Sequence, residues 1–219
     1  METIKLSCLL PRVFDDQAGR ERFAGSQLML AEAVLNRGSV YCVNASSGSG
    51  KTSLCSFIYG VRDDYSGRIS FDNIDARSLS VDDWCMLRRR HLAYLPQELE
   101  LFDSLSAIDN VHLKNRLTGF KTDEEIISMF KRLEIGDIVD RPAGRISVGQ
   151  KQRVAIIRAL CQPFDFIILD EPVSHLDAYN NGLCGALIVE EARRQGAGIV
   201  FTSVGNPLST GVPVIPMKL

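Results

Sequence analysis

The order of polar and apolar positions divides the chain into short apolar runs and longer amphipathic segments. Apolar runs of β-strand length occur at residues 6–10, 39–45, 68–71, 91–96, 164–170, 198–203 and 213–217. Segments with helical spacing lie between several of them, at residues 51–60, 122–134, 149–162 and 180–196. The stretches FIIL and GIVF are apolar throughout, as expected of strands that are buried on both faces of a parallel sheet. The pattern therefore predicts an α/β fold with a mainly parallel sheet.

Two further segments refine this architecture. The stretch RISFDNI is typical of a hairpin strand, which predicts a small antiparallel β subdomain beside the parallel sheet. The stretch from about residue 102 to 148 predicts a helical insert. A length of 219 residues suits one large domain with a well-buried core. We expect a single domain over 1–219, with the α/β core at about 1–101 and 149–219 and a helical subdomain at about 102–148.

Composition and charge exclude several classes of function. With 45% hydrophobic and 24% charged residues, the chain has the composition of a soluble globular protein. A formal net charge of −2 gives no reason to expect nucleic-acid binding. The one dense basic run, Arg88–His91, is interpreted as the solvated end of a helix. No apolar run approaches the ~18–20 residues that span a bilayer.

The N-terminal stretch and the cysteines predict a location. METIKLSCLLPRVFDD lacks the arrangement of a signal peptide, because acidic residues lie on both sides of its apolar centre. The six cysteines are scattered and form no C-x-x-C pair, and most of them sit among apolar residues, which predicts that most are small buried side chains in a reducing compartment. We therefore expect a cytoplasmic protein, with any membrane role arising through a partner.

A glycine-rich loop between a predicted strand and a predicted helix carries the clearest chemistry. NASSGSGKTSL, residues 44–54, fits the phosphate-loop pattern G-x-x-x-x-G-K-[ST] except that Ala45 replaces the first glycine. Helix N-terminal N–H groups bind anions, and glycines let successive N–H groups turn toward a phosphate. A simple Gly/Ser helix cap is the alternative interpretation. The residues expected to hold nucleotide phosphates are Ser47, Gly48, Ser49, Gly50, Lys51, Thr52 and Ser53.

An acidic pair follows the buried strand at FIIL. Asp170 and Glu171 come at the carboxyl end of this strand, and Pro172 holds Glu171 extended. Paired carboxylates beside a sheet are costly without partners, which Mg²⁺ and a water molecule can supply. We expect Asp170 and the Thr52 hydroxyl to hold Mg²⁺, and Glu171 to polarise the attacking water. An acidic loop start at the sheet edge is the alternative interpretation.

The order of further motifs resembles that of the ATP-binding-cassette (ABC) ATPases. In RISVGQKQRVAIIRAL, residues 146–150 are similar to the LSGGQ signature of this family. Gln97 in YLPQ resembles the Q-loop, and residues 174–177 (SHLD) resemble the D-loop. Ser147 and Gln150 also form the pattern of a helix capping box, and Asp177 also suits a helix N-cap. Both local interpretations are compatible with the family motifs.

The resemblance implies a phosphate-loop NTPase fold, ATP with Mg²⁺ as ligands, and a head-to-tail dimer of cassettes. It implies that Ser147, Gly149 and Gln150 of one cassette close the ATP site of the other, and that Asp177 lies at the dimer interface. Gln97 is implied to contact Mg²⁺ and the attacking water. An aromatic residue before the first glycine loop usually stacks on adenine in this family, and Phe14 is the candidate here, with Phe23 as the alternative.

The chain departs from the family at three positions. Val148 replaces one of the two glycines of the signature, and Ala45 replaces the first glycine of the phosphate loop. Ser203 stands where the family has a catalytic histidine that contacts the γ-phosphate. A serine side chain is shorter than that of histidine, and its hydroxyl cannot carry a positive charge. Because losing one preorganised donor typically costs ~10²–10³-fold in rate, we expect normal ATP binding and slow hydrolysis.

The resemblance leaves more than one function open. The first is the nucleotide-binding subunit of a membrane transporter, as a homodimer or paired with another cassette and docked to an integral-membrane permease at the inner face of the membrane. Residues 98–117 resemble the compact cassettes of lipoprotein-release, macrolide-export and cell-division systems. The second is a hydrolysis-deficient regulatory or scaffold module. The third, a cassette ATPase acting on nucleic acid, needs a basic face that the composition does not show.

Overall fold

The computed structural model describes residues 1–46 and 48–219, and its centre is a parallel sheet with helices on both faces. Adjacent strands pair in parallel throughout this five-stranded sheet. Its strands, in spatial order, are β6 (Leu92–Leu95), β7 (Phe166–Leu169), β8 (Gly198–Ser203), β3 (Val40–Asn44) and β9 (Ile215–Lys218). The α/β fold with a mainly parallel sheet is therefore confirmed.

A second, four-stranded antiparallel sheet lies beside the first. Its strands, in spatial order, are β2 (Glu32–Asn36), β1 (Thr3–Pro11), β4 (Tyr65–Phe71) and β5 (Ile74–Asp75). The hairpin predicted at residues 68–74 is present as the β4–β5 pair. Strand β2 was not predicted, although Ala33 and Leu35 are buried between exposed neighbours in the alternating pattern of a half-buried strand.

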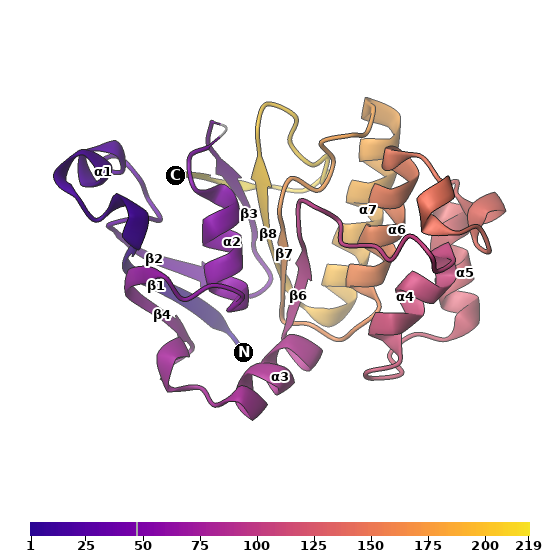
Figure 1. Ribbon diagram of the computed structural model, residues 1–219, viewed down its shortest axis with the longest axis horizontal. Coiled ribbons are helices and arrows are strands. Elements are labelled where there is room, and N and C mark those ends of the chain that lie inside the picture. Colours follow the sequence, from indigo (N-terminus) through magenta and orange to yellow (C-terminus); the bar gives the residue numbers. More distant parts are fainter. Residues whose placement is uncertain (47) are drawn as a thin grey trace.

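Four of the helices coincide with the predicted segments, and three do not. The predicted helices are α2 (Lys51–Tyr59), α5 (Asp123–Arg132), α6 (Val148–Leu160) and α7 (Ala178–Gln195). The others are α1 (Gln17–Arg22), α3 (Val81–Arg90) and α4 (Ala107–Asn115). Helices α4 and α5 lie between β6 and α6 in the chain and gather at the far end of the molecule from α1 (Figure 1). The described part of the chain contains no helix that is both long and apolar enough to cross a bilayer.

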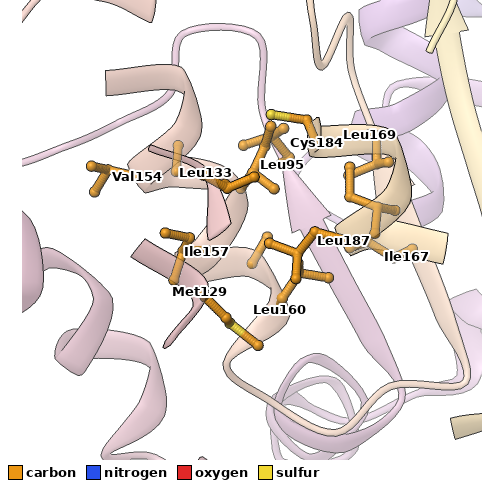
Figure 2. Close-up of a cluster of buried hydrophobic side chains, with 14 of the residues drawn as sticks. Leu95, Met129, Leu133, Val154, Ile157, Leu160, Ile167, Leu169, Cys184 and Leu187 are labelled. Atoms are coloured by element: carbon orange, nitrogen blue, oxygen red, sulfur yellow. The ribbon is translucent and has the colours of Figure 1, made fainter. Parts of the chain in front are cut away.

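The parallel sheet separates two apolar cores because successive residues of a strand face opposite sides. On β7, Phe166 and Ile168 join the core shared with α2 and the antiparallel sheet, whereas Ile167 and Leu169 join the core shared with α6 and α7. Figure 2 shows part of the second core, where side chains from α5, α6 and α7 meet those of β6 and β7. Burial on both sides therefore fixes the strand ends from which the loops of the site project.

The basic run at residues 88–90 ends helix α3, as predicted, but it is only partly solvated. Arg89 and Arg90 are exposed. The half-buried Arg88 instead donates from Nε to the Tyr59 carbonyl oxygen at 3.0 Å and from Nη2 to the Gly60 carbonyl oxygen at 2.6 Å. These carbonyls belong to the C-terminal end of α2, where a cation and hydrogen-bond donors are favoured. Arg88 therefore joins α3 to the helix that begins at the glycine-rich loop.

Candidate functional site

The glycine-rich loop connects the end of β3 at Asn44 to the start of α2 at Lys51. Gly48 and Gly50 have φ values of 71° and 98°, a left-handed conformation that favours glycine over other residues. The Lys51 side chain is only 4% exposed, and Nζ donates to the carbonyl oxygens of Ala45 at 3.1 Å and Ser46 at 2.8 Å. The loop thus wraps around the lysine. The prediction for Ser47 falls outside the described residues.

A cavity of about 310 Å³ opens over the N-terminal end of α2. It brings together predicted site residues from four segments of the chain. Those that line it are Phe14, Gly48, Ser49, Gly50, Lys51, Thr52, Ser53, Gln97 and Glu171. The Ser49 hydroxyl is buried and has no hydrogen-bond partner among the described residues. A helix N-terminus, left-handed glycines and a lysine in one hollow form a site suited to phosphate.

The two aromatic candidates for adenine stacking differ in position. Phe14 is half-buried and lines the cavity. Phe23 is 2% exposed and packs edge-on against Phe14, with ring centroids 5.4 Å apart. Arg22 lies with its guanidinium 5.1 Å from the centre of the Phe14 ring and donates to the Gly48 carbonyl oxygen at 2.7 Å. Phe14 therefore remains the candidate, and Phe23 supports it from the core.

The acidic pair lies beyond the end of β7, next to the neighbouring strand β8. Asp170 is 1% exposed, and its Oδ1 accepts a hydrogen bond from the Thr202 hydroxyl at 2.7 Å. The same hydroxyl accepts a bond from the Glu171 backbone N–H at 2.9 Å. Glu171 has a left-handed φ of 49°, so the extended backbone predicted for it before Pro172 is wrong. Its Oε1 lies 3.7 Å from Lys51 Nζ. Thr202 was not predicted as a site residue, yet it fixes both acidic residues.

Three of the site's oxygen atoms suit a magnesium ion. Asp170 Oδ2 is buried and has no hydrogen-bond partner among the described residues, which is costly for a carboxylate oxygen unless a cation or water satisfies it. The Thr52 hydroxyl and Gln97 Oε1 are 3.2 Å apart in the cavity over α2, which Asp170 itself does not line. Oxygen ligands of this kind, with few protein ligands and space for water, are those that Mg²⁺ prefers. The residues present therefore fit the ion.

Ser203 ends β8 and follows Thr202 directly. It is 3% exposed, and its hydroxyl has no hydrogen-bond partner within the described part of the chain. Its backbone pairs in register with Asn44, the residue that ends β3 and begins the glycine-rich loop. An unpartnered buried hydroxyl at this place can donate one hydrogen bond to a ligand or a water molecule.

The signature segment, residues 146–150, leads into α6 and does not line the cavity beside the glycine-rich loop of this chain. Ser147 Oγ accepts from the Gln150 N–H at 3.2 Å, and Gln150 Oε1 accepts from the Ser147 N–H at 2.9 Å, so the predicted capping box is present. Val148, the first residue of the helix, is 52% exposed. A side chain at Gly149 would meet the His175 carbonyl oxygen and Leu176 at 3.4 Å, so this helix start lies against the loop before α7.

Asp177 is the N-cap of α7. Its Oδ1 accepts from the Asn180 N–H at 2.8 Å, and this bond lowers the pKa of the exposed Asp177 carboxyl. Within one chain, the contacts of Asp177 are therefore those of a helix N-cap. Buried Gln152 of α6, which was not predicted, connects this region to the acidic pair: it donates to the Glu171 carbonyl oxygen at 3.2 Å and accepts from the His175 N–H at 3.1 Å.

A glycine-rich loop between a parallel strand and a helix, with a buried lysine that lies 3.7 Å from the Glu171 carboxylate, defines a phosphate-loop nucleotide-binding protein. Comparison with known proteins narrows this class. The model of the ABC transporter family matches residues 30–174. The ATP-binding protein YtrE of Bacillus subtilis is 30% identical over 168 residues, a match that covers 75% of this chain and 73% of YtrE. The chain therefore belongs to the ABC transporter family.

Other relatives and solved structures agree with this assignment. The macrolide export ATP-binding/permease protein MacB of Shewanella sp. strain ANA-3 is 30% identical over 170 residues. That match covers 76% of this chain but only 26% of MacB, so the chain spans about a quarter of that protein. The dimeric structure of MJ0796, a bacterial ABC transporter cassette, superposes with a TM-score of 0.78 over 98% of this chain and 94% of that one, at 24% identity. The fold is therefore that of an ABC cassette.

Proposed function

We propose that this chain binds and hydrolyses ATP as the nucleotide-binding subunit of a membrane transporter. The observation that carries the proposal is the placement of Lys51. The loop buries this lysine beneath the glycine-rich turn, and its ammonium group lies 3.7 Å from the Glu171 carboxylate at the edge of the cavity. A buried cation that faces both the anion-binding turn and a carboxylate suits a triphosphate whose terminal phosphoryl group is transferred to water.

Each residue of the cavity has a proposed role in holding ATP. Phe14 stacks on adenine, and Lys51 contacts the β- and γ-phosphates. The N–H groups of the loop and of the first turn of α2 bind the remaining phosphate oxygens. The residues in this role are Ser47, Gly48, Ser49, Gly50, Thr52 and Ser53. Thr52, Asp170 and Gln97 are the residues that hold Mg²⁺, directly or through water, and the ion neutralises charge on the phosphates when bound.

Hydrolysis is proposed to depend on Glu171, Gln97 and Ser203. Glu171 polarises the attacking water, and Gln97 orients it. Ser203 presents its buried hydroxyl from the end of β8, where the family resemblance places a histidine. Because a hydroxyl supplies one short, uncharged donor, we propose that turnover is slow while ATP binding is normal. The relatives give no support to the alternative of a hydrolysis-deficient regulatory module.

Dimerisation is proposed to complete the ATP site. Ser147, Gly149 and Gln150 begin a capped helix that does not line the chain's own cavity, which leaves this anion-binding end for the ATP of a second cassette. Asp177, exposed at the start of α7, lies at the same interface in this proposal. The dimer is a homodimer or a mixed dimer with another cassette, and MJ0796 supports it as a dimeric cassette of the same fold.

Besides the second cassette, the proposed partner is an integral-membrane permease. YtrE and MacB are named as transporter ATP-binding proteins, and MacB combines its ATP-binding and permease parts in one protein. A hollow of about 370 Å³ lies between the segment after Gln97 and the start of α6, and a permease helix is proposed to dock beside it. The chain is thereby held at the cytoplasmic face of the membrane.

The proposal is tested by ATP-dependent dimerisation. The Glu171→Gln variant should bind ATP without hydrolysing it, so it should elute as a dimer with ATP·Mg²⁺ and as a monomer with ADP, measured by size-exclusion chromatography with light scattering. Adding Ser147→Arg to Glu171→Gln should abolish the dimer and keep ATP binding, because the arginine blocks the signature. A Lys51→Ala variant should bind no ATP. Failure of Glu171→Gln to bind ATP would contradict the proposed function.

A further inference from the structure

One cation in the nucleotide cavity belongs to none of the family motifs. Arg62 follows α2 by three residues and nevertheless lines the same cavity as Phe14, Lys51 and Glu171. Its side chain runs back along α2, where the guanidinium lies 5.2 Å from the centre of the Phe57 ring. It ends at the first turn of the helix, where Nη1 donates to Ser53 Oγ at 3.0 Å. Arg62 therefore brings a positive charge to the phosphate-binding end of α2.

Three contacts hold this guanidinium in place. Asp64 accepts from both Nε, at 2.8 Å, and Nη2, in a two-pronged carboxylate pair. This pair raises the pKa of Arg62 and lowers the pKa of Asp64, so both groups stay charged at neutral pH. Ser53 takes one proton of Nη1. A guanidinium has five N–H donors, so two remain available for a ligand in the cavity.

We propose that Arg62 is an additional nucleotide-binding residue that contacts the phosphate chain where it passes Ser53. This inference rests on the proposed function, which puts the phosphates on the first turn of α2. The Ser53 hydroxyl accepts from Arg62 and keeps its own proton to donate, so both residues can face one phosphate oxygen. Arginine suits this role because its planar donors bind phosphate in a fixed geometry. Asp64 serves to aim the guanidinium.

The proposal predicts a loss of affinity that depends on the phosphates of the ligand. Arg62→Ala should weaken ATP and ADP binding by about tenfold, which is the loss of one charge-assisted hydrogen bond. Arg62→Lys should recover part of this loss, since a lysine keeps the charge but cannot engage Asp64 and Ser53 together. Arg68→Ala is the matched control, because Arg68 is an exposed arginine on β4 that pairs with Asp75 at 3.0 Å outside the cavity.

Isothermal titration of ATP, ADP and adenosine with each variant tests this inference. The expected result is weaker ATP and ADP binding by Arg62→Ala alone, with adenosine binding and the thermal unfolding midpoint unchanged. Equal affinities for wild type and Arg62→Ala would overturn the role of Arg62 and leave the proposed function standing. An equal loss in Arg68→Ala would also overturn it, because the effect would then come from net charge. A wild-type protein that binds no ATP would overturn both.

Discussion

Thr202 is the residue that holds both acidic residues of the site, Asp170 by its side chain and Glu171 by its backbone. Its hydroxyl donates to Asp170 and accepts from the Glu171 N–H, and it is almost fully buried. Thr202→Val has nearly the same shape but leaves both groups unsatisfied. We expect the free energy of unfolding to fall by about 1–3 kcal/mol and ATP turnover to fall with it, measured by urea denaturation and phosphate release. Thr202→Ser keeps the hydroxyl and is the control; equal turnover in Thr202→Val and wild type would contradict this role.

Lys114 predicts a pH dependence of stability. Burial, and then the nearby Arg158 and Arg88, lower its pKa to about 8, whereas an unfolded lysine titrates near ~10.4. Between these values the unfolded chain binds more protons than the folded one, so this group makes stability rise with pH. Lys114 thus destabilises the fold fully below its folded pKa, and this effect disappears as the pH passes the unfolded pKa.

Lys114→Met keeps the length of the side chain and removes its charge. We expect this variant to be more stable than wild type at pH 7, with a difference that narrows toward pH 10, in urea unfolding at both pH values. Arg90→Met, at the exposed end of α3, is the control and should show no such narrowing. A stability difference that is the same at both pH values would show that Lys114 does not titrate in this way.

At the scale of elements, a buried ion pair joins the helical insert to the core. Lys121, just before α5, donates to Glu191 of α7 at 2.8 Å, and the two side chains are 6% and 2% exposed. Removing one member of a buried pair leaves an uncompensated charge, whereas replacing both with apolar residues is often near neutral. Arg194 also contacts Glu191, at 2.9 Å, and so keeps one partner for it.

This pair predicts strongly non-additive substitutions. Lys121→Met should lower the free energy of unfolding by about 3 kcal/mol. This value lies at the lower end of the losses that are typical of a broken buried ion pair, because Arg194 remains as a partner of Glu191. The double variant Lys121→Met/Glu191→Leu should recover most of that loss. Urea denaturation of both variants and of Glu191→Leu alone completes the cycle. Additive losses in the double variant would show that the two side chains stabilise the fold independently.

At the scale of the whole molecule, the sequence predicted those features that depend on local pattern. Uniformly apolar β7 and β8 predicted the buried parallel sheet, and the loop before Lys51 predicted an anion site at a helix start. Strand β2 was missed although its alternation was present. Helices α3 and α4 had no predicted segment of their own because they bury few apolar residues: α3 buries none, and α4 buries only Ala107 and Val111. A helix with few buried apolar positions gives a weak periodic signal.

The contacts that complete the site could not be predicted in this way. Thr202 reaches Asp170 only because β8 lies beside β7, and Arg62 reaches Ser53 only because its side chain folds back along α2. Gln152 reaches the Glu171 carbonyl from a different helix. Each of these residues has an ordinary sequence context, so its function depends on tertiary packing that no local pattern encodes.

Steady-state ATP hydrolysis by the wild type, Glu171→Gln and Ser203→His tests the central claim most directly, with ATP binding recorded for all three. We predict that all three bind ATP, that the wild type hydrolyses it slowly, and that Glu171→Gln does not hydrolyse it. Ser203→His should be faster than wild type by up to ~10²-fold, because it restores a charged donor beside the γ-phosphate. Equal turnover in Glu171→Gln and wild type, or no gain in Ser203→His, would contradict the account.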